Sequence, residues 1–203
     1  MKNLIFLIAS IGFLGFTSCK DDNNSDFQTH DENEMMALMH EMMAVMDNMT
    51  PTNDPDEDWA MMMRAHHLGA IDMANLELQK GDDTTLRNMA TEMISKQQAE
   101  IAALTTFIDN HTPHLSKPDF TQKMMEHMEH SGKDKDLQAL TGDTDHDFAA
   151  LMFVHHESGI KMAELLLEYG EDTETRQLAE QVIADQKQDV SELQDWLLNN
   201  KPF

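Results

Sequence analysis

The residues best suited to chemistry in this sequence are two pairs of adjacent histidines flanked by methionines. In the first group, Met62 and Met63 stand one helical turn before His66 and His67, and Met73 follows two turns after His66. An α-helix turns by about 100° per residue, so these side chains fall on one stripe and its edge. The second group repeats the pattern with Met152, His155, His156 and Met162.

Thioether and imidazole ligands together suit a soft monovalent metal. Thioether sulfur binds Cu(I) well and hard cations poorly, and imidazole serves both Cu(I) and Cu(II). The alternative is that these residues belong to the core, since Met at helical spacing is usually packing and a buried His is usually a satisfied polar group. The repetition of the whole group favours a metal site. The second site would have one thioether fewer, because Leu151 replaces Met62.

Two further segments are rich in methionine and histidine. From Met35 to Met49 a methionine recurs every three or four residues, which fits an amphipathic helix docked on a bundle and equally a metal-binding stripe. The segment from Met124 to His130 is short and charged, so we expect accessible metal capture there. The candidate ligands in the two segments are Met39, His40, Met43, Met124, His127, Met128 and His130.

The sequence contains a duplication at a constant offset of 89 residues. Residues 58–110 align with residues 147–199 without a gap, and about a third of the aligned pairs are identical. In each copy, apolar residues at helical spacing are interrupted by Gly81 or Gly170, which predicts two helices joined by a tight turn. Two antiparallel hairpins bury each other's apolar faces, so the predicted fold is an all-α four-helix bundle with Met-rich flanking helices.

The bundle is predicted over residues 53–203, with the first copy at about 55–110 and the second at about 144–200. A Met-rich N-terminal helix is expected at residues 32–50, and a connecting helix with Met and His at residues 116–130. Both are expected to lie outside the duplication. Residues 131–142 are expected to form a flexible polar loop. No segment alternates in the manner of a β-strand.

The start of the chain reads as a targeting segment. Lys2 precedes an apolar run of about a dozen residues, shorter than the roughly 20 that a spanning helix needs, and small residues precede Cys19. This resembles a bacterial lipobox and predicts a signal peptide at residues 1–18, lipidation of Cys19 and a disordered tether at residues 19–31. The lipoprotein is then expected in the cell envelope, on the outer membrane facing the periplasm or the cell surface. An uncleaved anchor or an ordinary signal peptide is the alternative.

The composition argues against several function classes. An excess of 38 acidic over 14 basic residues gives a formal charge of −24, which disfavours nucleic acid or an anionic membrane surface as a partner. No Glu is followed by His three residues later, as a di-iron bundle needs, and no His-Glu-x-x-His zinc-protease motif is present. In contrast, 19 methionines exceed what packing requires. The histidines expected to be ordinary surface residues are His30, His111, His114 and His146.

The residues around the two histidine pairs resemble the domain of unknown function 305 family, which includes copper-binding proteins of the CopM type. Each run begins with the pair at His66 or His155, continues to a small residue (Ala70 or Gly159) and Ile, and ends in Met-Ala. The resemblance covers about residue 55 to the C-terminus. It implies two tandem copies in a ferritin-like four-helix bundle, together with copper binding and a role in copper resistance.

The sequence therefore predicts an extracytoplasmic copper-sequestering lipoprotein that is not an enzyme. It would hold Cu(I), with Cu(II) as a second candidate, and would exchange the metal with a copper-delivery or efflux partner. Two alternatives stay open. One is a structural or interaction bundle in which the histidines are core polar groups, and the other is a copper-dependent oxidase.

Overall fold

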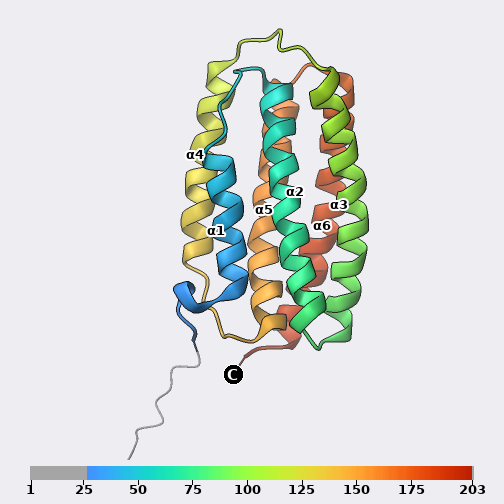
Figure 1. Cartoon of the computed structure of the whole chain (residues 1–203). Coiled ribbons are helices and arrows are strands. Elements are labelled where there is room, and N and C mark those ends of the chain that lie inside the picture. Colours follow the sequence, from blue (N-terminus) through green and yellow to red (C-terminus); the bar gives the residue numbers. More distant parts are fainter. Residues whose placement is uncertain (1–26, 203) are drawn as a thin grey trace, which may run out of the picture.

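A computed structural model describes residues 27–202 and shows α-helices running alongside one another (Figure 1). This confirms the predicted all-α fold. The predicted signal peptide and Cys19 lie outside the described residues. None of the helices within residues 27–202 is long and apolar enough to cross a membrane. The helices are α1 (Glu34–Asp47), α2 (Pro55–Lys80), α3 (Thr84–Asn110), α4 (Pro118–Asp136), α5 (Thr144–Tyr169) and α6 (Thr173–Asn199).

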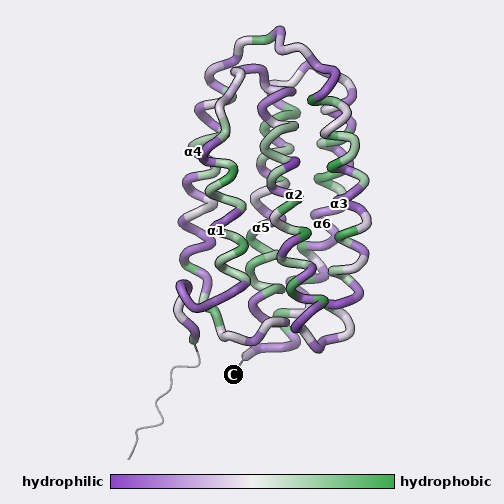
Figure 2. The backbone as a smooth tube through the Cα atoms, in the orientation of Figure 1, coloured by the Kyte–Doolittle hydropathy of each residue, from purple (hydrophilic) through white to green (hydrophobic). Residues whose placement is uncertain are grey.

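The helices form three layers, each made of one helix from either half of the chain. Helices α2 and α5 form the middle layer, with α3 packed on α2 and α6 packed on α5 (Figure 1). These four helices are the predicted four-helix bundle. Helices α1 and α4 cover the opposite side of α2 and α5. Hydrophobic stretches alternate with hydrophilic ones along the helices (Figure 2), as amphipathic packing requires.

Aspartate side chains begin the four long helices. Asp54, Asp83, Asp143 and Asp172 each accept a hydrogen bond from a backbone N–H of the first turn. Capping of this kind stabilises a helix by about 1 kcal/mol. Asp54 and Asp143 are related by the repeat offset, as are Asp83 and Asp172. The start signals are therefore part of the duplicated unit.

The duplicated unit is longer than the aligned region and includes α1 and α4. These helices end at Asp47 and Asp136, which differ by the same offset of 89 residues. Met39 in α1 and Met128 in α4 occupy equivalent positions, and both are buried. The expectation that these two segments lie outside the repeat was wrong. The unit consists of three helices, and two copies pack around an approximate twofold axis.

Helix α4 continues through Ser131 and Gly132 to Asp136, so the polar loop predicted from residue 131 was wrong over its first six residues. Gly132 serves packing here. A Cβ at this position would lie 2.5 Å from the Met43 Cε in α1, so the glycine lets the two helices approach closely. A glycine followed by a run of charged residues, as Gly132 is, is typical of a loop, and the sequence does not show the close approach of α1.

The prediction of a disordered tether over residues 19–31 was also wrong for the last of these residues. The backbone N–H of Gln28 donates to the Leu140 carbonyl oxygen at 2.7 Å, and a 3-10 turn at His30–Glu32 leads into α1. The partner of Gln28 lies more than a hundred residues away in the sequence. Such a non-local backbone pairing leaves no compositional signal, whereas the polar composition of the segment favours disorder.

Aspartates in the first turns of α2 and α5 lock the two copies together. Asp56 in α2 accepts hydrogen bonds from the Glu171 backbone N–H at 3.0 Å and the Thr175 hydroxyl at 2.5 Å. Asp145, its equivalent in α5, accepts from the backbone N–H groups of Asp82 and Asp83. Each central helix therefore fastens the hairpin turn of the other copy, which fixes the register in which the two histidine pairs meet.

Candidate metal centre

The two histidine pairs meet at the middle of the α2–α5 layer. His66 in α2 and His155 in α5 stack with ring centroids 3.6 Å apart and an interplanar angle of 28°. The His155 Nε2 lies 3.2 Å from the carbonyl oxygen of His66. Within the described part of the chain neither ring nitrogen of His66 has a hydrogen-bond partner, and the side chain is fully buried. Buried polar groups are nearly always hydrogen-bonded, so an unpartnered imidazole at the centre of the fold requires an explanation.

The outer histidine of each pair faces a carboxylate from the α3–α6 layer. The His67 Nε2 lies 2.8 Å from Glu100 Oε2, and the His156 Nε2 lies 3.5 Å from Asp189 Oδ2. Glu100 and Asp189 are equivalent in the two copies. A carboxylate beside an imidazole orients the ring and fixes its tautomer, which is the usual surrounding of a metal-binding histidine.

A glycine opens space over the stacked rings. A Cβ added at Gly159 in α5 would lie 3.0 Å from the Cε1 of His66 and would overlap the Gln186 amide, so a larger residue does not fit. The side-chain nitrogen and oxygen of Gln186 are buried without hydrogen-bond partners. A second polar group at the centre therefore also lacks a protein partner.

The central imidazoles are held neutral. Burial lowers the pKa of His66 well below its usual value, and the nearby charge of Lys135 acts in the same direction. Burial, followed by the charges of His66 and His156, does the same for the pKa of His155. A neutral imidazole keeps the lone pair that a metal ion needs, so these rings do not have to lose a proton before binding one.

Lys135 in α4 is the feature of the centre that opposes cation binding. Its side chain is fully buried, and its ammonium nitrogen has no hydrogen-bond partner. Burial lowers the pKa of Lys135 to about 8, so most of the molecules carry the charge at pH 7. The equivalent position in α1 is Met46, which brings a thioether in place of a charge.

The methionines predicted beside the histidine pairs lie in the core. They are placed in α2 and α5, on either side of the imidazoles along the chain. Leu151, the departure in the second copy, is buried as well. Burial is what both a packing role and a closed metal site require, so it does not decide between them. The fully or almost fully buried methionines of this set are Met62, Met63, Met73, Met152 and Met162.

The predicted ligands in α1 divide between core and surface. Met39 is buried against the central layer, and Met43 is half-buried beside Gly132. His40 is exposed, with its Nε2 3.1 Å from an oxygen of Asp136 in α4. The structure therefore does not bring His40 together with the methionines of the same helix. The alternative of a docked amphipathic stripe describes the buried methionines of α1.

The expectation of accessible metal capture in α4 was wrong for the methionines. Met124 and Met128 are buried in the core. His127 turns toward α5, where its Nε2 lies 3.2 Å from the Ser158 carbonyl oxygen, and burial lowers the pKa of His127. Only His130 is exposed, with its Nδ1 bonded to a carbonyl oxygen of its own helix. The sequence suggested an exposed segment because α4 is short and charged, but its apolar stripe docks on α5.

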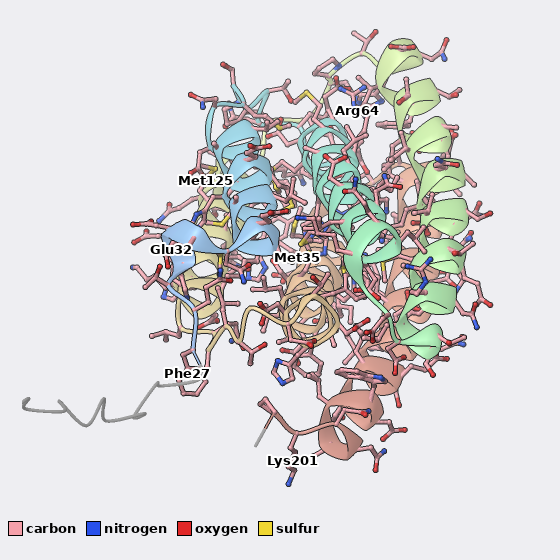
Figure 3. All side chains as sticks on the ribbon, turned by 60° about the horizontal axis from the view of Figure 1, so that its bottom comes forward. Phe27, Glu32, Met35, Arg64, Met125 and Lys201 are labelled. Atoms are coloured by element: carbon pink, nitrogen blue, oxygen red, sulfur yellow. The ribbon has the colours of Figure 1, made fainter. Side chains whose placement is uncertain are left out.

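Methionines from three helices line one cavity at the end of the bundle where α2 begins. Met62 and Met124 were predicted as ligands. Met61 and Met125 were missed because neither lies one helical turn from a histidine in the sequence. Met125 is 40% exposed, so the cavity has a thioether at its rim. Sulfur atoms are seen around α1 and α4 in Figure 3, where Met35 and Met125 are labelled. The methionines lining the cavity are Met46, Met49, Met61, Met62, Met124 and Met125.

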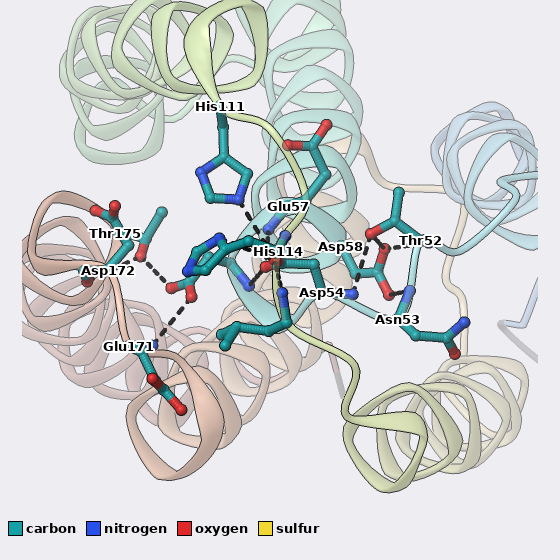
Figure 4. A network of polar contacts seen from close by, with 12 residues as sticks. Thr52, Asn53, Asp54, Glu57, Asp58, His111, His114, Glu171, Asp172 and Thr175 are labelled. Atoms are coloured by element: carbon teal, nitrogen blue, oxygen red, sulfur yellow. Dashed lines mark hydrogen bonds and ion pairs between the residues drawn. The ribbon is translucent and has the colours of Figure 1, made fainter.

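A second group of potential ligands lies at the same end and was missed. Asp54, His111 and His114 place one ligand atom each within 4.8 Å of one another (Figure 4). His111 was expected on the surface, but its side chain is only 7% exposed. The ring stacks on Phe107, one turn earlier in α3, with centroids 4.6 Å apart. The spacing of these two aromatic rings is the signal in the sequence that could have revealed the burial.

Solved structures resemble the chain over most of its length. CopM in the Ag-bound form is 25% identical, with a TM-score of 0.55, and the match covers 72% of this chain and 96% of that chain. CopM in the Cu(I)-bound form is 26% identical, with a TM-score of 0.53, covering 71% and 96%. A DUF305 fragment from Deinococcus radiodurans shares the fold at 19% identity, with a TM-score of 0.55 and coverage of 74% and 100%.

A search of the curated proteins gives no match. The family model described as "Domain of unknown function (DUF305)" matches residues 16–108 and 56–197. The two matches overlap and are consistent with tandem copies. Together they span most of the chain, including both histidine pairs. The chain therefore belongs to the DUF305 family.

Proposed function

We propose that the protein binds copper through imidazole and thioether ligands, chiefly as Cu(I). The observation that carries the proposal is the central histidine stack. His66 is buried with both ring nitrogens unpartnered, and burial keeps the pKa of His66 and His155 low enough for both rings to be neutral. A bound metal would supply the missing partner, and imidazole is a ligand that copper accepts in both oxidation states.

The kinship with CopM supports copper as the metal. The structures at 25% and 26% identity hold silver and Cu(I), which are both soft monovalent ions. These neighbours are metal-binding proteins and not known enzymes, which supports sequestration over turnover. The many thioethers of this chain fit the same class of ion, because thioether sulfur prefers Cu(I) to hard cations.

The methionine cavity would be the place where the metal enters. Its rim carries Met125, which is exposed, and its wall carries Met62, which lies one helical turn from His66 along α2. Thioethers do not titrate, so capture by the cavity would not depend on pH in the neutral range. Cu(I) taken up at the rim would pass from sulfur ligands to the imidazoles, with Met63, Met73, Met152 and Met162 as further ligands of the centre.

The cellular setting is also a proposal. The apolar run before Cys19 supports export and lipid attachment, and the acidic surface would concentrate cations around the anchored protein. In the cell envelope, methionine holds copper without forming disulfides as cysteine would. The protein would then sequester copper outside the cytoplasm and pass it to a delivery or efflux partner.

A Cu(I) titration against a chromophoric chelator tests the proposal. The full chain is used with Cys19→Ser, so that no thiol competes for the metal. We expect His66→Asn with His155→Asn to weaken Cu(I) binding at least about tenfold, which corresponds to about 1.4 kcal/mol. The matched control replaces two histidines outside the centre, His30→Asn with His146→Asn, and should bind as the parent does.

Equal Cu(I) affinity in the two double variants, with both folded by circular dichroism, would show that the central histidines are structural polar groups. Oxidation of a phenolic substrate by the copper-loaded chain would favour the oxidase alternative instead. Retention of copper without turnover is the result expected of a sequestering protein.

A further inference from the structure

The cluster of Asp54, His111 and His114 has the geometry of a cation site. The His111 Nε2 and the His114 Nδ1 each lie 3.5 Å from the same oxygen, Oδ2 of Asp54 (Figure 4). Bonds of about 2.0–2.1 Å around a tetrahedral ion hold neighbouring ligand atoms about 3.3 Å apart. The two separations from Asp54 are close to that spacing, and all three ligand atoms lie within 4.8 Å of one another. Both separations are also longer than good hydrogen bonds.

Four backbone hydrogen bonds hold the carboxylate of Asp54 in place. Its Oδ1 accepts from the backbone N–H of Asp56 and Glu57 at the start of α2, and its Oδ2 accepts from the backbone N–H of His114 and Leu115. Carboxylates that ligate metals are characteristically fixed by further hydrogen bonds in this way.

Two polar atoms around Asp54 have no hydrogen-bond partner among residues 27–202. The His111 Nε2 is buried without a hydrogen bond, in a side chain that is more than nine-tenths buried. The Oε2 of Glu57 is also buried without a hydrogen bond. A cation bound between Asp54, His111 and His114 would supply the missing partner of His111.

We propose that Asp54, His111 and His114 bind a divalent cation of the Zn(II) and Cu(II) class. Two imidazoles and one carboxylate are the ligands that such borderline ions prefer. The cluster contains no thioether, so it would not compete with the methionine cavity for Cu(I). His114 is 58% exposed and lies in the segment between α3 and α4, where it can close on an incoming ion. The proposal is independent of the copper function proposed above.

Only one copy of the repeat carries these ligands. The position equivalent to Asp54 is Asp143, but the position equivalent to His111 is Asn200. Asp143 accepts a hydrogen bond from the backbone N–H of His146 and serves as a helix cap. The second copy thus shows that the fold does not need the histidines in order to form its helix start. One divalent ion per chain is expected at this site.

The test measures Zn(II) binding by isothermal titration in the full chain with Cys19→Ser. His111→Asn introduces the residue of the second copy and is combined with His114→Asn. We expect the double variant to lose one Zn(II) equivalent or to bind it at least about tenfold more weakly. Its Cu(I) affinity should be unchanged. The control is His30→Asn with His146→Asn, which should retain the parent Zn(II) isotherm.

Thermal melts exclude a trivial loss of fold. A stoichiometric excess of Zn(II) should raise the melting temperature of the parent, because ligand binding to the folded state stabilises it, and should raise that of the double variant less. An unchanged isotherm and an unchanged shift in the double variant would show that Asp54 only fastens the loop. Loss of Cu(I) affinity without loss of Zn(II) would also overturn the proposal. Failure of the copper proposal would show in the His66 and His155 variants instead.

Discussion

The two ends of the molecule, which the duplication relates, carry different chemistry. Where α2 begins, methionines line a cavity and Asp54 stands between two histidines. Where α5 begins, four of the equivalent positions carry other residues: Met46, Met61, Met62 and His111 correspond to Lys135, Ala150, Leu151 and Asn200. Asp54, Met124 and Met125 keep their residue types, as Asp143, Met35 and Met36.

The centre between the ends has stayed symmetric. His66 stacks on its own equivalent, His155, and each outer histidine faces an acidic residue at the same position of the repeat. This contrast indicates that the imidazole layer belongs to the shared scaffold, whereas the end near Asp54 has been specialised. Exchanging residues between the two ends is therefore the most direct way to test what each end does.

The largest effect on stability is expected when Met46 is replaced by lysine, the residue at the equivalent position 135. Met46 is 1% exposed among the thioethers of the cavity, so Met46→Lys would bury an ammonium group without a partner. We expect the free energy of unfolding to fall by about 3 kcal/mol, and Cu(I) binding to weaken through repulsion. Val45→Lys, at an exposed position one residue earlier, is the control for urea unfolding. Equal stability of the two variants would mean that the cavity tolerates charge as the other end does.

The reverse exchange, Lys135→Met, is expected to stabilise the protein by about 2 kcal/mol at pH 7, because it removes a buried unpaired charge. Repulsion of a metal at His66 would also disappear, so Cu(I) affinity should rise. The pH dependence follows from the pKa of Lys135, which is 10.5 for the free side chain and which burial lowers to about 8 in the folded state. Between these values the unfolded chain binds more protons, so stability rises with pH.

The parent should therefore gain stability between about pH 8 and pH 10.5, and Lys135→Met should lack that gain. Chemical denaturation at several pH values measures both. Lys133→Met removes an exposed lysine of the same helix and should keep the pH profile of the parent. A profile of Lys135→Met that coincides with the parent would show that Lys135 reaches water.

A buried acidic residue also distinguishes the two copies. Glu77 in α2 corresponds to Leu166 in α5. Burial, a hydrogen bond with Asp145 and the charge of Asp145 raise the pKa of Glu77 from 4.5 to about 8. The folded protein then keeps a proton that the unfolded chain releases, so stability falls as pH rises from about 4.5 to 8. Glu77→Gln should remove this fall.

At pH 8 we expect Glu77→Gln to raise the free energy of unfolding by about 1 kcal/mol. The gain is only partial, because the amide donates a weaker hydrogen bond than the carboxylic acid does. At pH 4.5 the variant and the parent should have similar stability. Thermal melts across the pH range test this, with Glu180→Gln at an exposed position of α6 as the control. A gain that is the same at every pH would contradict titration of Glu77 as the cause.

Much of this architecture could be predicted from the sequence. The offset of 89 residues and the glycines at Gly81 and Gly170 predicted both hairpins, because these signals are local or repeated. The pairing of α1 with α4 was missed because most equivalent residues there differ, as Met46 and Lys135 do, and the few identical pairs, such as Met39 with Met128, lie outside the continuous alignment. Sequence identity at a fixed offset reveals a shared position only while the residue type is kept.

The candidate site was harder to predict than the fold. The histidine pairs were located from their spacing, but the stacking of His66 on His155 depends on how α2 and α5 pack. The approach of His111 to Asp54 joins the end of α3 to the start of α2, and the two residues are far apart in the sequence. Periodicity reports which residues share a face of one helix, but not which ends of different helices meet.

The smallest effect on stability is expected for Met62→Leu, which copies Leu151 of the second end. Leucine and methionine have similar volumes, so we expect the free energy of unfolding to change by less than about 1 kcal/mol. Cu(I) affinity should nevertheless fall severalfold, since one thioether of the cavity is lost next to the helical turn that carries His66. Met36→Leu is the matched control, because Met36 is fully buried but does not line the cavity.

Chelator competition and urea unfolding on the same samples separate sulfur chemistry from packing. If Met62→Leu and Met36→Leu bind Cu(I) equally well, then the methionines near α2 only pack the core, as Leu151 does at the other end. A fall in affinity confined to Met62→Leu, with stability unchanged in both variants, would mean that the thioether itself binds the metal. Because the second end is folded with leucine at this position, loss of structure could not account for that result.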